Sequence, residues 1–280
     1  VALEMGREGN RLGQSIGSVW GQAGALNSMA VAYLEQGDLE KVIDSLAEAR
    51  RLAEEAGMRP LVYFGLPYLV LTYLSAGAFE EADQLADQLY AERDSLIQVY
   101  RRTSLGVAAE VKIRLGQLEL AERILAEAFE GLDLDGPLFG MKRLLLADAY
   151  FQLALDNPRR GLERMEYLTG RMHQAGIGQY LAEGHTLQGK ALLALNEPGS
   201  ARAAFLEGLD AGQETGSRRM LWQILWELSQ LEAAAGDASA ADRYKQEARE
   251  IVTTIADQAG SRELRASFLA LPEVQAVSAG

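Results

Sequence analysis

The chain has 280 residues, a formal net charge of −13 and no cysteine, and 48% of its residues are hydrophobic. The acidic balance disfavours binding to nucleic acid or to an anionic membrane, because both need a basic face, and we expect neither as a direct partner. The lack of cysteine excludes disulfides and thiolate metal sites, and it is compatible with a reducing cytoplasm, the location that we expect. No apolar window approaches the roughly 18 residues that a membrane span needs.

Residues 1–17 have the pattern of a second helix that belongs to an earlier repeat. Gly17 lies 40 residues before Gly57, and Leu12 lies 40 residues before Leu52. We therefore expect that the chain starts inside a repeat and is part of a larger protein. The apolar face of such an exposed end would favour self-association, so the prediction leaves a homodimer open.

The first complete unit, residues 18–57, predicts two helices joined by a two-residue turn. Its halves, Trp20–Gln36 and Leu39–Ala56, each place apolar residues at steps of three and four, which marks one face of an α-helix. Between them, Gly37 suits the left-handed conformation that ends a helix, and Asp38 can cap the next helix. Two amphipathic helices joined this closely pack antiparallel.

This unit recurs about every 40 residues up to the C-terminus. A small residue is needed where the second helix crosses the first, and this position holds Val42, Ala82, Ala121, Gly161, Ala201 and Ala241. The turn position holds residue types that tolerate a left-handed backbone, namely Gly37, Gly77, Gly116, Asp156, Asn196 and Gly236. The predicted repeats span residues 18–57, 58–97, 98–137, 138–176, 177–216 and 217–260. Such repetition predicts one elongated domain, residues 1–280, with an all-α fold: a right-handed α-solenoid of antiparallel helix pairs.

Two segments depart from the regular unit. The first helix of the second repeat, Leu61–Leu74, is apolar nearly all round, which indicates either burial between neighbouring helices or an apolar floor for a ligand or a dimer contact. Pro67 lies in this run and should kink the helix or delay its start. At the other end, residues 261–280 are predicted to form a capping helix and tail, with Ser261 as the cap and Pro272 as the end of the helix. This helix should cover the core of the last repeat.

The pattern of small and large residues resembles the tetratricopeptide repeat family, at Leu26, Ala30, Tyr33, Ala82, Ala121 and Leu125. A tetratricopeptide unit has about 34 residues, so each unit here is longer by more than a helical turn. The longer form resembles the C-terminal repeats of bacterial signalling ATPases, nucleotide cyclases and maltose-activator-type transcription regulators, and the tail Arg265–Val274 resembles the way such proteins end. The resemblance implies that the first helices line a concave groove in which ligands bind.

Projected onto this chain, the groove displays an aromatic residue among clustered polar groups, which is typical of a peptide or small-molecule site. The expected groove residues are Asn27, Val31, Phe64, Leu71, Thr103, Glu110, Arg114, Asp148, Gln152, Glu183, Thr186, Lys190, Gln223, Trp226 and Gln230. Some of them could form ordinary surface ion pairs instead, Glu110 with Arg114 and Asp148 with Lys190.

No motif predicts catalysis or metal binding. The segment Gly184–Ala191 nearly matches a phosphate-binding loop, but Ala191 replaces the hydroxyl residue and no strand precedes the segment. The two histidines, His173 and His185, fall on different predicted helices, and a transition-metal site usually needs three or four ligands. We therefore expect no catalytic residue, no metal site and no cofactor, and we do not expect an enzyme.

The sequence predicts a non-catalytic sensor or protein-interaction module. It would be the C-terminal part of a larger bacterial signalling or regulatory protein and would bind a protein segment or a small effector in its concave groove. The alternative is a stand-alone scaffold or adaptor that assembles by repeat-end or groove contacts. A third reading, an enzyme built on an α-solenoid, would require turnover that depends on a buried polar cluster.

Overall fold

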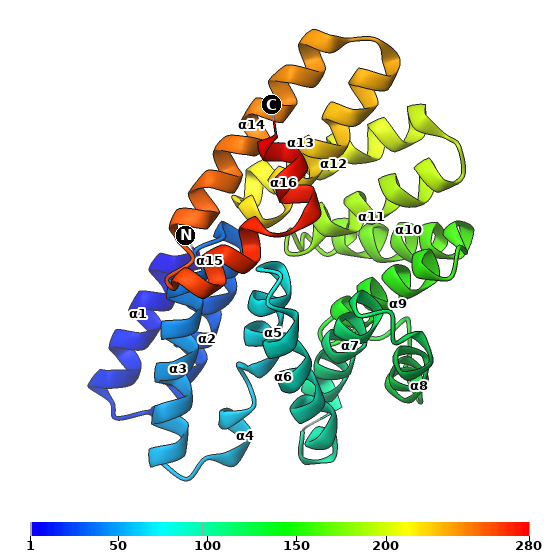
Figure 1. Ribbon diagram of the computed structural model, residues 1–280. Coiled ribbons are helices and arrows are strands. Elements are labelled where there is room, and N and C mark those ends of the chain that lie inside the picture. The colour runs from blue at the N-terminus through cyan, green and yellow to red at the C-terminus, as the bar shows by residue number, and fades with distance from the viewer. Residues whose placement is uncertain (1, 97, 280) are drawn as a thin grey trace.

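The computed structural model describes residues 2–96 and 98–279, and every regular element in these ranges is a helix (Figure 1). After α1 (Ala2–Ser15), helix pairs stack side by side into an all-α solenoid. The first helices of the pairs are α2 (Val19–Gln36), α5 (Leu66–Ser75), α7 (Gln98–Arg114), α9 (Lys142–Ala154), α11 (Leu181–Ala194) and α13 (Arg218–Ala235). Their partners are α3 (Leu39–Glu55), α6 (Phe79–Ala91), α8 (Leu118–Phe129), α10 (Pro158–Gln174), α12 (Pro198–Thr215) and α14 (Ala238–Asp257). Shorter elements are α4 (Arg59–Val62), η1 (Arg93–Ser95), α15 (Arg262–Leu269) and α16 (Pro272–Ser278).

A residue in the left-handed conformation makes each short turn between paired helices. These residues have φ between +56° and +87°, and they are the ones that the repeat pattern selects: Gly37, Gly77, Gly116, Asp156, Asn196 and Gly236. The left-handed residue lets the chain leave one helix and reverse direction within two or three residues. The predicted turns are therefore confirmed, including the two that lack glycine.

The small residues at the helix crossings are buried, as the repeat pattern predicts. Val42, Ala82 and Ala121 are 0% exposed. In the fifth pair, Gly189 lies under the ring of Phe205, and an added Cβ would come to 2.5 Å from the Cε1 atom of that ring. Close approach of the paired helices thus depends on a small residue at each crossing.

Pro67 delays the first helix of the second repeat, as predicted. The chain forms the single turn α4, leaves the helical path, and restarts as α5 at Leu66 with Pro67 in the first turn, where the missing N–H removes no hydrogen bond. Helix α5 packs against α2, α3, α6 and α7, and Val70 and Leu71 are buried. Burial between neighbouring helices therefore explains most of its apolar surface.

Two short helices follow the last repeat. Helix α15 begins after Ser261, whose side chain accepts a hydrogen bond from the backbone N–H of Leu264 at 3.0 Å, as predicted. Leu264 and Phe268 are buried against the last pair. The sequence analysis does not predict α16. Pro272 starts this helix instead of ending the chain's regular structure, because proline also suits the first turn of a helix.

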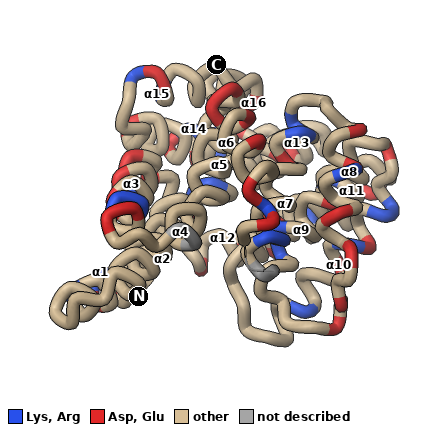
Figure 2. Tube along the Cα trace, turned by 90° about the horizontal axis from the view of Figure 1, so that it is seen from below, with Lys and Arg blue, Asp and Glu red and all other residues tan. Residues whose placement is uncertain are grey.

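The outer faces carry charges of both signs. Figure 2 shows acidic and basic residues interleaved along α3, where Arg51 pairs with Glu48 and Glu55. Exposed pairs of this kind add little stability, but they keep the outer face hydrophilic. Within the described ranges, no helix combines the length and the apolar content that crossing a membrane requires.

The solenoid closes on itself, which corrects the elongated array expected from the period. Helix α2 contacts α13, and the turn between α2 and α3 meets the end of α14 (Figure 1). The backbone N–H of Glu40 donates to the carbonyl of Gln258 at 3.1 Å. Ile255 packs so closely on Gly37 that an added Cβ would lie 2.5 Å from its Cγ1 atom. The small rotation from each pair to the next, summed along the array, brings the first repeat to the sixth.

Gly37→Ala should destabilise the protein more than its matched control, Gly116→Ala. The two glycines have φ of +70° and +71°, so each alanine carries the strain of a left-handed backbone, about 1 kcal/mol. Only at position 37 does the new methyl group also collide with Ile255, and overpacking adds about 1–3 kcal/mol. Nothing lies within 4 Å of the added Cβ at position 116. Urea unfolding followed by circular dichroism measures both losses, and equal losses would contradict the closure contact.

Candidate functional site

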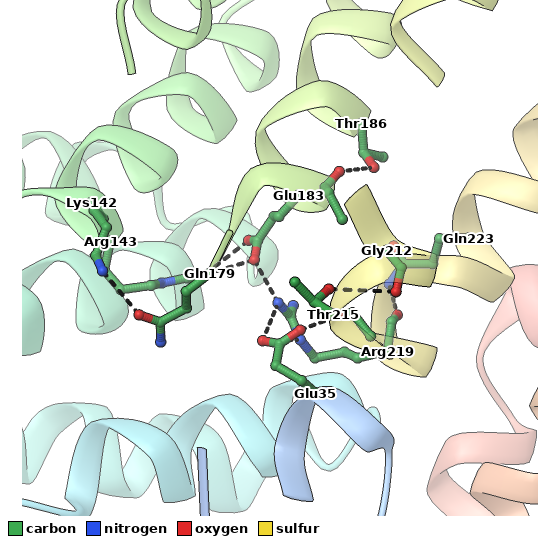
Figure 3. A network of polar contacts seen from close by, with 12 residues as sticks. Glu35, Lys142, Arg143, Gln179, Glu183, Thr186, Gly212, Thr215, Arg219 and Gln223 are labelled. Carbon is green, nitrogen blue, oxygen red and sulfur yellow. Dashed lines mark hydrogen bonds and ion pairs between the residues drawn. The ribbon is translucent and has the colours of Figure 1, made fainter. Parts of the chain in front are cut away.

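A line of alternating charges crosses the inside of the closed solenoid. We call it the ion-pair chain, and it consists of Glu110, Arg143, Glu183, Arg219 and Glu35, in that order. Figure 3 shows its part from Arg143 to Glu35. Arg143 donates to Glu110 and, through Nη1, to both carboxylate oxygens of Glu183 at 2.9 Å. Arg219 donates through Nη2 to Glu183 at 2.8 Å and to Glu35 at 2.9 Å. The ion-pair chain thereby joins α7, α9, α11, α13 and α2.

Glu183 is the centre of the ion-pair chain and is held in its charged form. Burial alone would raise its pKa, but the charges and hydrogen bonds of Arg143 and Arg219 outweigh burial and lower the pKa to about 2. Burial and the charge of Glu183 raise the pKa of Tyr150 to about 12, and the Tyr150 hydroxyl donates to Glu183 at 3.2 Å. Loss of either guanidinium group would leave this buried carboxylate with less counter-charge, which costs free energy.

The ion-pair chain borders two cavities. The inner cavity encloses about 80 Å³ and is partly open to solvent; it is lined by Leu71, Leu74, Ser75, Phe79, Glu110, Arg114, Tyr150, Lys190, Arg219, Trp222, Gln223, Trp226, Glu227, Leu271 and Glu273. The aromatic cavity encloses about 40 Å³ and is also partly open to solvent; it is lined by Phe64, Pro67, Tyr68, Tyr100, Thr103, Phe139, Gly140, Lys142, Arg143, Gln179 and Tyr180. First helices supply most of the lining of both cavities.

The inner cavity combines aromatic surface with charges of both signs. The Arg114 guanidinium lies 5.2 Å from the centre of the Tyr150 ring, and Lys190 Nζ lies 3.2 Å from Glu227 Oε1. Trp222 and Trp226 line the same space. Leu271 and Glu273, at the start of α16, line one side of the cavity. The arrangement can bind a ligand that has both an apolar body and polar groups.

The structure brings six of the expected groove residues to the inner cavity: Leu71, Glu110, Arg114, Lys190, Gln223 and Trp226. Phe64 and Thr103 line the aromatic cavity. Asn27 lines a third cavity between α2, α3 and α5, and its side chain donates to the carbonyl of Ala23 at 2.8 Å.

The remaining expected groove residues lie elsewhere. Asp148 and Gln152 are buried and turn toward α10, because Asp148 accepts from Arg164 at 2.7 Å and also from Gln152. Gln230 is exposed, Val31 is half-buried, and neither lines a described cavity. Thr186 is buried and bonds to the backbone of its own helix. Among these residues, Asp148 contacts the partner helix of its own pair instead of lining a described cavity.

Two expected ion pairs are wrong. Glu110 pairs with Arg143 and not with Arg114, and Asp148 pairs with Arg164 while Lys190 pairs with Glu227.

Sequence reasoning missed Arg143, Arg219 and Glu35. One signal could have found them: Arg143 and Glu183 are 40 residues apart, one repeat period, and carry opposite charges on first helices. Charged residues at repeat spacing on a face that the pattern predicts to be buried require a partner of opposite sign.

The two histidines meet, although they lie on different helices. His173 Nε2 on α10 lies 3.2 Å from His185 Nε2 on α11. Burial lowers the pKa of His185, and Gln188 and Glu207 oppose that shift. No set of three or more histidine, cysteine or acidic residues in the described ranges is arranged to hold a metal ion. The phosphate-loop-like segment, residues 184–191, is a continuous part of α11.

Glu183→Gln should lower the free energy of unfolding by about 3–5 kcal/mol near neutral pH, because Arg143 and Arg219 lose a shared buried counter-charge. The folded-state pKa of Glu183, about 2, lies below the ordinary value. Its charge therefore contributes stability that is complete above about pH 5 and is lost as the pH falls toward about 2. Urea unfolding across this range should show a steeper loss for the parent than for the variant. An equal dependence of the unfolding free energy on pH in the parent and the variant would contradict the low pKa of Glu183. An exposed control, Glu54→Gln, should change the stability by less than about 0.5 kcal/mol.

Comparison with known proteins identifies the fold. No protein-family model and no curated protein sequence matches the chain. Among solved structures, the chain is similar to a tetratricopeptide repeat protein from Parabacteroides merdae ATCC 43184, with a TM-score of 0.51 and 12% identity over 99% of each chain. It is also similar to BtubC (BKLC) from P. vanneervenii, with a TM-score of 0.51 and 17% identity over 78% of this chain and 91% of that chain. At these identities the similarity establishes the fold, an all-α solenoid of the tetratricopeptide type.

Proposed function

We propose that this chain is a non-catalytic recognition module that binds a short protein segment or a small effector in its inner cavity. The observation that carries the proposal is the convergence of Arg114, Lys190, Gln223 and Trp226, from three first helices, on one space. These residues are among those that the repeat register projects into the groove. The tetratricopeptide-type fold supports the same class of function, since such folds commonly mediate protein–protein interaction.

The size and lining of the inner cavity favour a compact ligand. The enclosed part of this cavity is about 80 Å³, which is room for a compact group of a small molecule or for a single side chain of a peptide. The closure between α2 and α13 limits the room for a long helix along the axis. The aromatic surface of Trp222 and Trp226 would contact the apolar body of the ligand, and Arg114 and Lys190 would orient its polar groups.

The C-terminal helix offers a way to couple binding to a change in the rest of a larger protein. Leu271 and Glu273 at the start of α16 line the inner cavity, so a ligand there would touch the last helix of the described chain. A ligand that binds one arrangement of α16 more tightly than another would shift the balance between them. In this proposal the parent protein is a cytoplasmic bacterial signalling or regulatory protein, and the chain is its sensor.

Tryptophan fluorescence can test binding at the inner cavity. Trp222 and Trp226 line the cavity, and Trp20 lies on α2 and is 57% exposed. In a Trp20→Phe background the emission therefore reports only the cavity. A ligand found in a screen of peptide pools and small effectors should change this emission and raise the melting temperature.

Arg114→Ala should weaken that ligand about tenfold, because a hydrogen bond from a charged donor is lost. The matched control is Arg123→Ala on the outer face of α8, which should bind as the parent does. A ligand that stabilises the parent and Arg114→Ala equally would contradict the proposed site.

The alternative, a scaffold that assembles through a repeat end, is favoured by one surface. Met5 and Ile16 on or just after α1 are 70% and 77% exposed, and Trp20 lies beyond them on α2. Large apolar side chains exposed together are typical of interaction surfaces. If assembly is the function, sedimentation should show a concentration-dependent dimer that Ile16→Lys abolishes, while the inner cavity binds nothing.

A further inference from the structure

The aromatic cavity lies at the opposite ends of the first helices from the inner cavity. Its walls hold the rings of Phe64, Tyr68, Tyr100, Phe139 and Tyr180. The Phe64 and Tyr100 rings meet edge to face at 4.3 Å, and Tyr100 and Phe139 meet in the same way at 6.0 Å. Phe139 is 60% exposed at this place. Because these rings already pack on one another, a flat group would pack on the exposed side of the cluster, against Phe139, and not between the rings.

The cavity also contains a lysine without a counter-charge. Lys142 Nζ donates to the neutral amide oxygen of Gln179 at 2.9 Å (Figure 3). It also lies 5.6 Å from the centre of the Tyr180 ring. No carboxylate of the described residues pairs with it, whereas Lys112 and Lys190 both have carboxylate partners. Burial lowers the pKa of Lys142, as expected of a cation that lacks a partner.

Arg143 adds a second donor that has no partner. Its two terminal nitrogens are engaged by Glu110 and Glu183, but its Nε–H is buried and forms no hydrogen bond with the described residues. The side chain is 2% exposed and lines the aromatic cavity. A buried donor of this kind costs about 1–3 kcal/mol when nothing accepts from it.

Three helices begin at the same cavity. Pro67, Lys142 and Tyr180 line it, and they stand at the starts of α5, α9 and α11. None of these three helices has a side-chain hydrogen bond at its N-cap. The positive ends of their dipoles favour a negative charge nearby, although in α5 the first-turn N–H groups of Leu66 and Tyr68 already donate to backbone carbonyls and Pro67 has none.

We propose that the aromatic cavity binds a small organic anion with a flat apolar body, of the aromatic carboxylate class. The carboxylate would meet Lys142, and the flat body would pack against the exposed side of the aromatic rings. A cationic ligand would face Lys142 and three helix N-termini, and a neutral one would leave Lys142 without a counter-charge. The net charge of −13 does not exclude an anionic ligand, because exposed charges farther away than about 10 Å are screened by salt. The site does not depend on ligand binding at the inner cavity.

Calorimetric titration of the full chain tests the proposal with three probes of one shape: 2-naphthoate, 2-naphthamide and 2-naphthylmethylamine. The carboxylate should bind at least about tenfold more tightly than the neutral amide, and the amine should bind most weakly. This comparison uses the unaltered protein. Equal binding of the carboxylate and the amide, or no binding of the carboxylate at millimolar concentration, would overturn the proposal.

Variants then locate the anion. Lys142→Gln should weaken 2-naphthoate binding about tenfold and leave 2-naphthamide unchanged, and Lys142→Arg should bind within a few fold of the parent. Lys190→Gln, which alters the inner cavity, should have no effect. If Lys190→Gln weakens the carboxylate and Lys142→Gln does not, the anion binds at the inner cavity and the assignment is wrong. If Lys142→Gln loses its helical circular dichroism, other measurements still test the anion site. Lys142→Arg should bind 2-naphthoate within a few fold of the parent, Lys190→Gln should bind it as the parent does, and added salt should weaken its binding to the parent.

Discussion

One buried carboxylate, Glu183, links the middle repeats of this solenoid to its closure contact. Glu183 accepts from Arg143 on one side and from Arg219 on the other, so a single side chain of the fifth repeat ties the fourth repeat to the sixth. Arg219 then reaches Glu35 of the first repeat. Because charges out of water are stable only with well-placed partners, the ion-pair chain favours one relative placement of five helices over others. Both cavities are bordered by this chain, and their shapes follow from that placement.

The local fold could be predicted because short-range sequence signals mark the turns and helix starts of each repeat. Gly37 and Asn196 mark turns by the conformations they tolerate, and Pro67 delays a helix because it lacks an N–H. Such rules act within a few residues and need no knowledge of the rest of the chain. Helix α16 escaped prediction because Pro272 fits the end of one helix and the start of the next equally well.

The closure could not be predicted in the same way. It depends on the rotation between neighbouring pairs, which is small for each pair and accumulates along the array. A pattern that repeats every 40 residues fixes which faces pack, but a few degrees per repeat separate an open superhelix from a closed one. The unpredicted rotation between repeats also explains why only part of the cavity lining could be predicted from the sequence. Arg114 and Trp226, which the register projects into the groove, line the inner cavity, while Asp148 is buried and pairs with Arg164.

The contact between the first and last repeats also changes how the chain folds. In an open solenoid each repeat touches only its neighbours, so the ends can fray while the middle stays folded. Here the hydrogen bonds from Arg219 to Glu35 join residues 184 positions apart, and no local contact can substitute for them. The loop between these residues is long, so forming this contact costs more chain entropy than forming a contact between neighbouring repeats. The two ends of this repeat array therefore protect each other, and terminal repeats that would otherwise be its weakest part take part in its cooperative core.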